Sequence, residues 1–69
     1  MNKKVKNKLA NNIKKLRKEK RISQESLSLE LDFDVSYIGK VENEKMNISI
    51  DRIIKIADFF EVNFEDLFK

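Results

Sequence analysis

Apolar and polar residues alternate without interruption over residues 26–35, a pattern typical of a half-buried β-strand. No other segment alternates in this way, and a strand without a partner would leave its backbone N–H and C=O groups unpaired. On a helix, Leu27 and Leu31 would lie within roughly 40° of each other and Leu29 roughly 200° from Leu27. We therefore predict a helix here, followed by a turn near Asp32, with Leu29 exposed either as bare surface or as part of a contact.

Other apolar residues recur at helical spacing along the chain. Ser, Asp and Asn residues suited to N-capping precede several of these runs, namely Ser23, Asp34, Ser49 and Asn63. The predicted helices cover residues 9–20, 24–31, 35–43, 50–60 and 64–68. The fourth is expected to bury one face, made of Ile50, Ile53, Ile54, Ala57 and Phe60. The sequence thus predicts a compact, all-α, five-helix domain over residues 9–69, preceded by a basic N-terminal arm over residues 1–8.

Charge is distributed unevenly around the net value of +3. Residues 1–21 hold ten Lys/Arg and one Glu (+9), whereas residues 22–69 hold five Lys/Arg and eleven Asp/Glu (−6). A basic first third suggests an anionic partner such as nucleic acid. For residues 1–8 a disordered, solvated arm is an equal alternative, but beyond Lys8 the basic residues interleave with an apolar stripe and should be ordered.

The residue types that the chain lacks exclude several classes of function. The chain contains no Cys and no His, which removes disulfides, thiolate metal sites and the usual general base. It also has no Gly-rich phosphate loop, so we expect neither an enzyme nor a bound cofactor or metal. No apolar run approaches the roughly 18 residues of a membrane span, and no apolar segment follows the basic N-terminus as in a signal peptide. A cytoplasmic protein is the simplest interpretation.

Residues 23–45, SQESLSLELDFDVSYIGKVENEK, resemble the helix-turn-helix core of the Cro/C1 (XRE-type) repressors. The flanks IKKLRKEKRISQ and NISIDRIIKIADFFEVNFEDLF are similar too, so the resemblance covers about residues 9–68. It implies a lambda-repressor-like domain that binds a two-fold symmetric DNA operator as a homodimer, with its third helix in the major groove, in the cytoplasm of a prokaryote or on a phage or bacterial nucleoid. FDVSYIGKVEN…NISID is similar to controller proteins of restriction–modification systems, while phage repressors and antitoxins remain alternatives. No domain for a small-molecule ligand is expected.

Site residues follow from the resemblance, position by position. Lys40 can donate to guanine O6 and N7, and Val35 can touch a thymine methyl group. The expected base-edge contacts are Val35, Ser36, Tyr37, Gly39 and Lys40. The expected phosphate contacts are Gln24, Asn43, Lys45 and Asn47. Arg17 and Glu42 match a family pair that joins the first and third helices as a structural ion pair.

Several of these assignments have simpler alternatives. Ser36 can be an ordinary residue of the first helical turn, Lys45 a solvated surface charge, and Arg17 a phosphate contact as second choice. Tyr37 can simply pack on the first helix. Gly39 lowers helix propensity by about 1 kcal/mol relative to alanine. It therefore either marks a close approach of DNA or is a tolerated residue without a role.

The C-terminal third is rich in phenylalanine, with Phe59, Phe60, Phe64 and Phe68. Phe59 projects off the apolar face of its helix, so Phe59 and Phe64 are candidates for a dimer interface. The alternative is that both fold over the edge of the core.

Two departures from the family argue against tight DNA binding. Many relatives carry Arg or Gln where this chain has Val35, and the carboxylates of Glu30, Asp32 and Asp34 near the turn would repel phosphates. The alternative function is therefore an antitoxin-like or other protein-interaction module with weak or no specific DNA binding.

Overall fold

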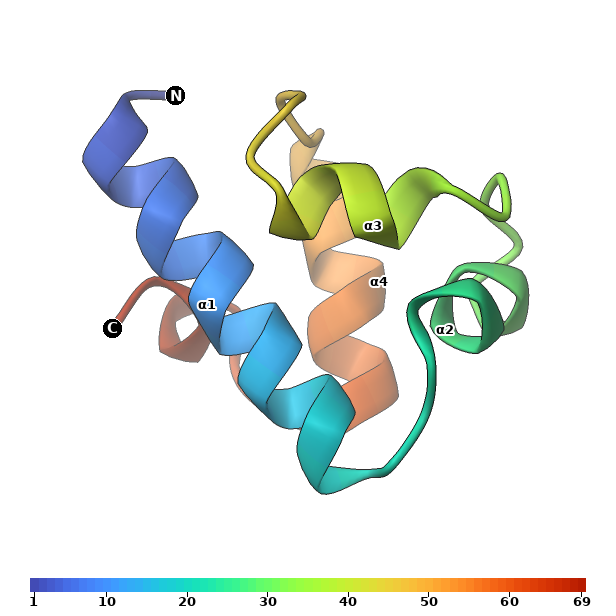
Figure 1. The fold of residues 1–69 in the computed structure, drawn as a ribbon. Helices are drawn as coiled ribbons and strands as arrows, with labels where there is room; N and C mark the ends of the chain where they lie inside the picture. The colour runs from blue at the N-terminus through green and yellow to red at the C-terminus, as the bar shows by residue number, and fades with distance from the viewer.

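The computed structural model describes residues 1–69 and contains four α-helices and a C-terminal 3₁₀ helix (Figure 1). These are α1 (Lys3–Glu19), α2 (Gln24–Glu30), α3 (Tyr37–Glu42), α4 (Ile50–Phe60) and η1 (Phe64–Phe68). The predicted all-α class is confirmed, although the fifth element is a 3₁₀ helix. Residues 26–30 belong to α2, so the alternating segment is not a strand, and Leu29 is 63% exposed. None of the helices has the length and apolar character needed to cross a membrane.

The first helix starts six residues before its predicted start, at Lys3 instead of residue 9. Asn2 is its N-cap, and the side-chain oxygen of Asn2 accepts a hydrogen bond of 2.9 Å from the N–H of Val5. Val5 is partly buried and lies one turn before Leu9, so it extends the apolar stripe backwards. Residues 3–8, which we predicted as a basic arm, are therefore part of α1.

The turn between α2 and α3 depends on the backbone conformation of one residue and on a hydrogen bond between the two helices. Asp32 takes the left-handed conformation, with φ of 61°, which Asp tolerates better than most residues. Asp34 is not the N-cap that we predicted, because α3 begins at Tyr37 and Ser36 occupies the N-cap position without a side-chain bond. Instead, the N–H of Ile38 donates to the buried hydroxyl of Ser28 at 3.0 Å. This bond fixes the start of α3 against α2.

The buried face of α4 differs from the prediction at three positions. Ile53 and Ala57 lie in the core as expected, and Ile56 joins them. Ile50 and Ile54 are 65% and 42% exposed, which contradicts their predicted place on the buried face. The helix is rotated so that its i, i+3, i+4, i+7 face, residues 53, 56, 57 and 60, packs inward.

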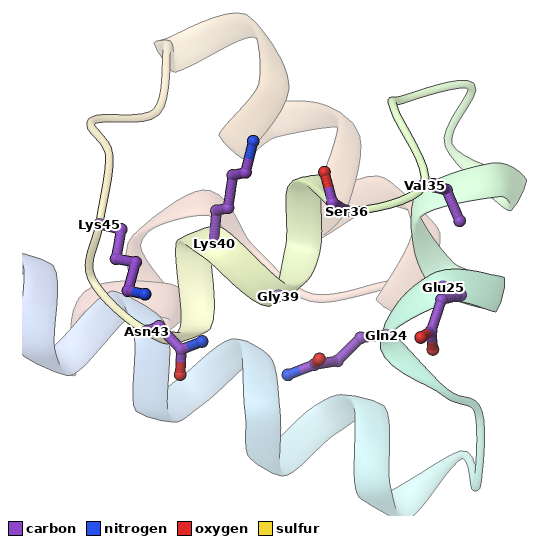
Figure 2. A pocket seen from close by; sticks show the side chains of 8 residues that line it. All are labelled: Gln24, Glu25, Val35, Ser36, Gly39, Lys40, Asn43 and Lys45. Atoms are coloured by element: carbon purple, nitrogen blue, oxygen red, sulfur yellow. The ribbon is translucent and has the colours of Figure 1, made fainter.

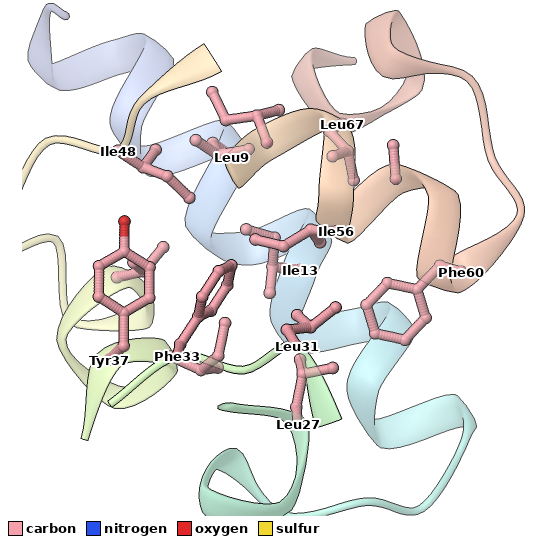
Figure 3. Close-up of a cluster of buried hydrophobic side chains, with 14 residues drawn as sticks. Leu9, Ile13, Leu27, Leu31, Phe33, Tyr37, Ile48, Ile56, Phe60 and Leu67 are labelled. Atoms are coloured by element: carbon pink, nitrogen blue, oxygen red, sulfur yellow. The ribbon is translucent and has the colours of Figure 1, made fainter. Parts of the chain in front are cut away.

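One apolar core joins all five elements (Figure 3). The C-terminal element closes it, since Leu67 of η1 is fully buried and its carbonyl accepts a hydrogen bond of 2.8 Å from the Nδ2 of Asn12 on α1. The Asp66 carboxylate of η1 accepts hydrogen bonds from Lys69 and from the backbone N–H of Asn63, and these lower the pKa of Asp66. The core consists of Leu9, Ile13, Leu27, Leu31, Phe33, Tyr37, Ile38, Val41, Ile48, Ile53, Ile56, Ala57, Phe60 and Leu67.

Candidate nucleic-acid interface

A shallow depression runs between the start of α2 and the outer face of α3 (Figure 2). Seven of the nine residues predicted for base or phosphate contact line it, and Tyr37 and Asn47 are the two that do not. Glu25 is the lining residue that the prediction missed. The full lining is Gln24, Glu25, Val35, Ser36, Gly39, Lys40, Asn43 and Lys45.

The buried face of α3 determines which of its side chains point outward. Ile38 and Val41 are buried in the core, at i and i+3. The opposite face therefore points outward, and it carries Ser36, Lys40 and Asn43, all exposed. Two buried apolar residues thus direct a row of polar side chains to the surface, a geometry that suits the reading of a groove.

Tyr37 is an exception to the predicted base contacts. Its side chain is only 6% exposed, and its ring meets that of Phe33 edge-on, with centroids 4.9 Å apart (Figure 3). The guanidinium of Arg52 lies 4.5 Å from the centroid of the Tyr37 ring. Tyr37 therefore packs in the core instead of facing a base, with its ring against Phe33 and the guanidinium of Arg52. Phe33 lies in the turn before α3, so helical spacing along the sequence could not reveal this pairing.

Arg17 and Glu42 form an ion pair between α1 and the end of α3. Arg17 Nε lies 2.7 Å from Glu42 Oε2, and Arg17 Nη2 lies 3.0 Å from Glu42 Oε1. Arg17 Nη1 also donates to the carbonyl of Ile22 at 2.9 Å. The two side chains are only 10% and 2% exposed, respectively. This geometry holds α3 in place and leaves Arg17 little access to a ligand.

Gln24 takes part in the same network, which sequence reasoning did not foresee. We expected its amide to point at a DNA backbone. In the structure its Nε2 donates to Glu42 Oε1 at 2.9 Å. Gln24 is therefore bonded to the last residue of α3 while it lines the depression.

Charges in and around the depression bear on its ligand. Lys40 and Lys45 line it, as does one carboxylate, that of Glu25. The acidic residues of the turn, Glu30, Asp32 and Asp34, are exposed but do not line it. The feature that argued most strongly against a phosphate-rich ligand therefore lies outside the depression. No group of acidic residues is arranged to hold a metal ion.

Large apolar side chains are exposed on α4 and on η1, two elements that contact each other. Phe64 is exposed and its ring centroid lies 5.2 Å from that of Phe68. Phe59, the other dimer candidate, is only partly exposed and packs edge-on against Phe60, with centroids 5.1 Å apart. Ile50 and Ile54 were missed as surface residues because the sequence pattern had assigned them to the core. We call Ile50, Ile54 and Phe64 the apolar α4–η1 patch.

Comparisons with known proteins agree on one class. A family model described as "Helix-turn-helix" matches residues 13–67. The control protein C.MunI of Mycoplasma sp. is 38% identical over 65 residues, which span 93% of this chain and 88% of that protein.

Two crystal structures are similar in fold. The restriction-modification controller protein C.AhdI of Aeromonas hydrophila superposes with a TM-score of 0.83 and 33% identity, over 91% of this chain and 96% of that one. The hypothetical transcription factor NHTF of Neisseria superposes with a TM-score of 0.89 and 31% identity, over 94% of this chain and 75% of that one.

Proposed function

Because this chain belongs to the Cro/C1-type helix-turn-helix family, we propose that it is a sequence-specific DNA-binding transcriptional regulator of the restriction–modification controller kind. One observation carries the proposal beyond the family. Seven residues predicted from the sequence for DNA contact, from three separate segments, line a single depression on the outer face of α3. The acidic residues of the turn, which favoured a protein-interaction module, lie outside it.

In this proposal α3 enters the major groove with its exposed face toward the bases. Lys40 donates to a guanine edge, Ser36 bonds a base, and the exposed Val35 side chain contacts a thymine methyl group. Gln24, Asn43 and Lys45 flank these residues and bind phosphates, which position the helix without carrying sequence information. Asn47, exposed in the loop before α4, is a further phosphate contact.

We further propose that the protein acts as a homodimer on a two-fold symmetric operator. The apolar α4–η1 patch supports this, because three of the six large apolar side chains that the domain leaves exposed lie on these two elements. A two-fold contact through the same patch on both copies would bury them. Phe59 remains at the edge of this interface, since part of its ring is already used by the core.

Selection from randomised duplex DNA at about 0.15 M salt tests the proposal as a whole. We expect enrichment of a two-fold symmetric motif, which would establish operator reading and dimerisation together. The spacing of its half-sites would give the geometry of the dimer. A pool without enrichment would contradict the proposal and would favour a protein partner instead.

Lys40→Ala should weaken binding to the selected operator by about 5- to 150-fold, the range expected for a lost contact to a guanine edge. Binding to unrelated DNA should change much less. Lys45→Ala is the matched control. The loss of a phosphate contact should weaken binding to operator and to unrelated DNA equally, and should reduce the slope of log affinity against log salt concentration by about one. Equal losses for both DNAs in the Lys40 variant would remove Lys40 from the base-reading set. Titrations of the native protein and both variants with each DNA, followed by fluorescence anisotropy, give the six affinities.

A further inference from the structure

We propose that Glu42 and Gly39 act together as positioning residues for Gln24, with Glu42 fixing the orientation of the Gln24 amide and Gly39 leaving the space that this side chain occupies. The proposal rests on the DNA-binding function proposed above. It assigns to Gly39 a role through Gln24 instead of a direct approach to DNA.

Glu42 is suited to this role because its own carboxylate is held firmly. Arg17 bonds both of its oxygens, at 2.7 and 3.0 Å, and is itself anchored to the carbonyl of Ile22. The Glu42 side chain is only 2% exposed, so it offers a rigid acceptor at the end of α3. Since an ionised carboxylate only accepts hydrogen bonds, the amide of Gln24 must turn its nitrogen toward Glu42. The structure shows this orientation, with Gln24 Nε2 at 2.9 Å from Glu42 Oε1.

Gly39 supplies the second part of the geometry. A Cβ atom at this position would lie 3.1 Å from Oε1 and 3.7 Å from Cδ of Gln24, and outside its own helix it would approach no other residue within 4 Å. Gly39 does not have a positive φ, so the backbone does not require glycine here. Figure 2 shows the Gln24 side chain reaching from α2 toward α3 beside Gly39. The missing Cβ is thus matched to one neighbour, the amide of Gln24.

The consequence concerns how Gln24 meets DNA. Its Nε2 has two hydrogens, and the bond to Glu42 uses one, which leaves the other for a phosphate oxygen. Because the side chain is held before binding, less rotamer freedom is lost when the contact forms. The amide also joins the start of α2 to the end of α3, so the phosphate contact and the reading helix keep a fixed relation.

A double-mutant cycle tests the role of Gly39. Gly39→Ala should weaken operator binding by about 3- to 10-fold, because Gln24 must shift to admit the methyl group. The melting temperature should hold or rise, since alanine favours the helix. In a Gln24→Ala background, the same substitution should change the affinity by less than about twofold. Equal losses in both backgrounds would show that Gly39 admits DNA directly and would overturn the proposal, as would no loss in the native background.

The free protein offers a readout that does not involve DNA. In ¹⁵N NMR spectra one Nε2 proton of Gln24 should show the slow exchange and downfield shift of a proton bonded to a carboxylate. Gly39→Ala should move this signal, whereas Lys45→Ala, which changes a side chain that is not bonded to Gln24, should not. A solvent-like Gln24 amide in the native protein would refute the positioning. If no operator is found, the proposed function is wrong. The NMR signals of the Gln24 amide would still show whether Glu42 and Gly39 fix the position of this side chain.

Discussion

Glu42→Ala is expected to lower the free energy of unfolding by about 3–5 kcal/mol, the usual cost of removing one partner of a buried ion pair. The guanidinium of Arg17, only 10% exposed, would lose both carboxylate bonds, and Gln24 would lose its bond to the same group. A core of this size supplies only about 3–5 kcal/mol of net stability, so a large fraction of the variant should be unfolded at 25 °C. Urea and thermal unfolding followed by circular dichroism measure the loss.

Two variants sharpen this test. Glu30→Ala removes an exposed glutamate with no ion pair in the structure and should stay within about 0.5 kcal/mol of the native protein. Combining Glu42→Ala with Arg17→Met removes both charges and should recover part of the loss, because no buried cation is left unpaired. A melting temperature unchanged by Glu42→Ala would show that the pair does not stabilise the fold.

Ile54→Asp should convert the proposed homodimer into a folded monomer. Ile54 is 42% exposed, so a carboxylate there can remain hydrated in the monomer, but in a two-fold interface it would be desolvated on both copies. Operator affinity should fall by about 10²- to 10⁴-fold, because the two half-site contacts would no longer be linked. Light scattering and operator titration measure the two effects, and circular dichroism checks the fold.

Leu29→Asp is the matched control for Ile54→Asp. Leu29 is more exposed than Ile54 but lies on α2, outside the apolar α4–η1 patch. We expect this variant to remain dimeric. A dimer that survives Ile54→Asp, or one that is lost with Leu29→Asp, would place the interface elsewhere. Phe59 is less suitable for such a test, because its ring also packs against the core and its replacement would disturb the fold.

Local signals in the sequence determined where several helices begin. The hydroxyl oxygens of Ser23 and Ser49 accept from backbone N–H groups three residues on, as predicted for N-caps. The donor and the acceptor of each of these hydrogen bonds lie within one helical turn of each other, so the sequence alone can reveal the N-cap. The helical nature of residues 24–30 was also predictable, since no second strand was available to pair with the alternating segment. The outer face of α3 followed from its two inward apolar residues in the same way.

Contacts between distant residues decided the rest. The start of α3 depends on a hydroxyl ten residues earlier, that of Ser28, and the burial of Tyr37 depends partly on Arg52. Periodicity identified α4 as amphipathic, but only packing determined that Ile56, and not Ile54, faces the core. The hydrogen bond between Gln24 and Glu42 joins residues 18 positions apart. The space that Gly39 leaves for the Gln24 side chain becomes apparent only when α2 and α3 are packed together. Spacing along the chain specifies which side chains share a helix face, whereas the rotation of each helix and the partners of its polar groups are set by the packing of the whole core.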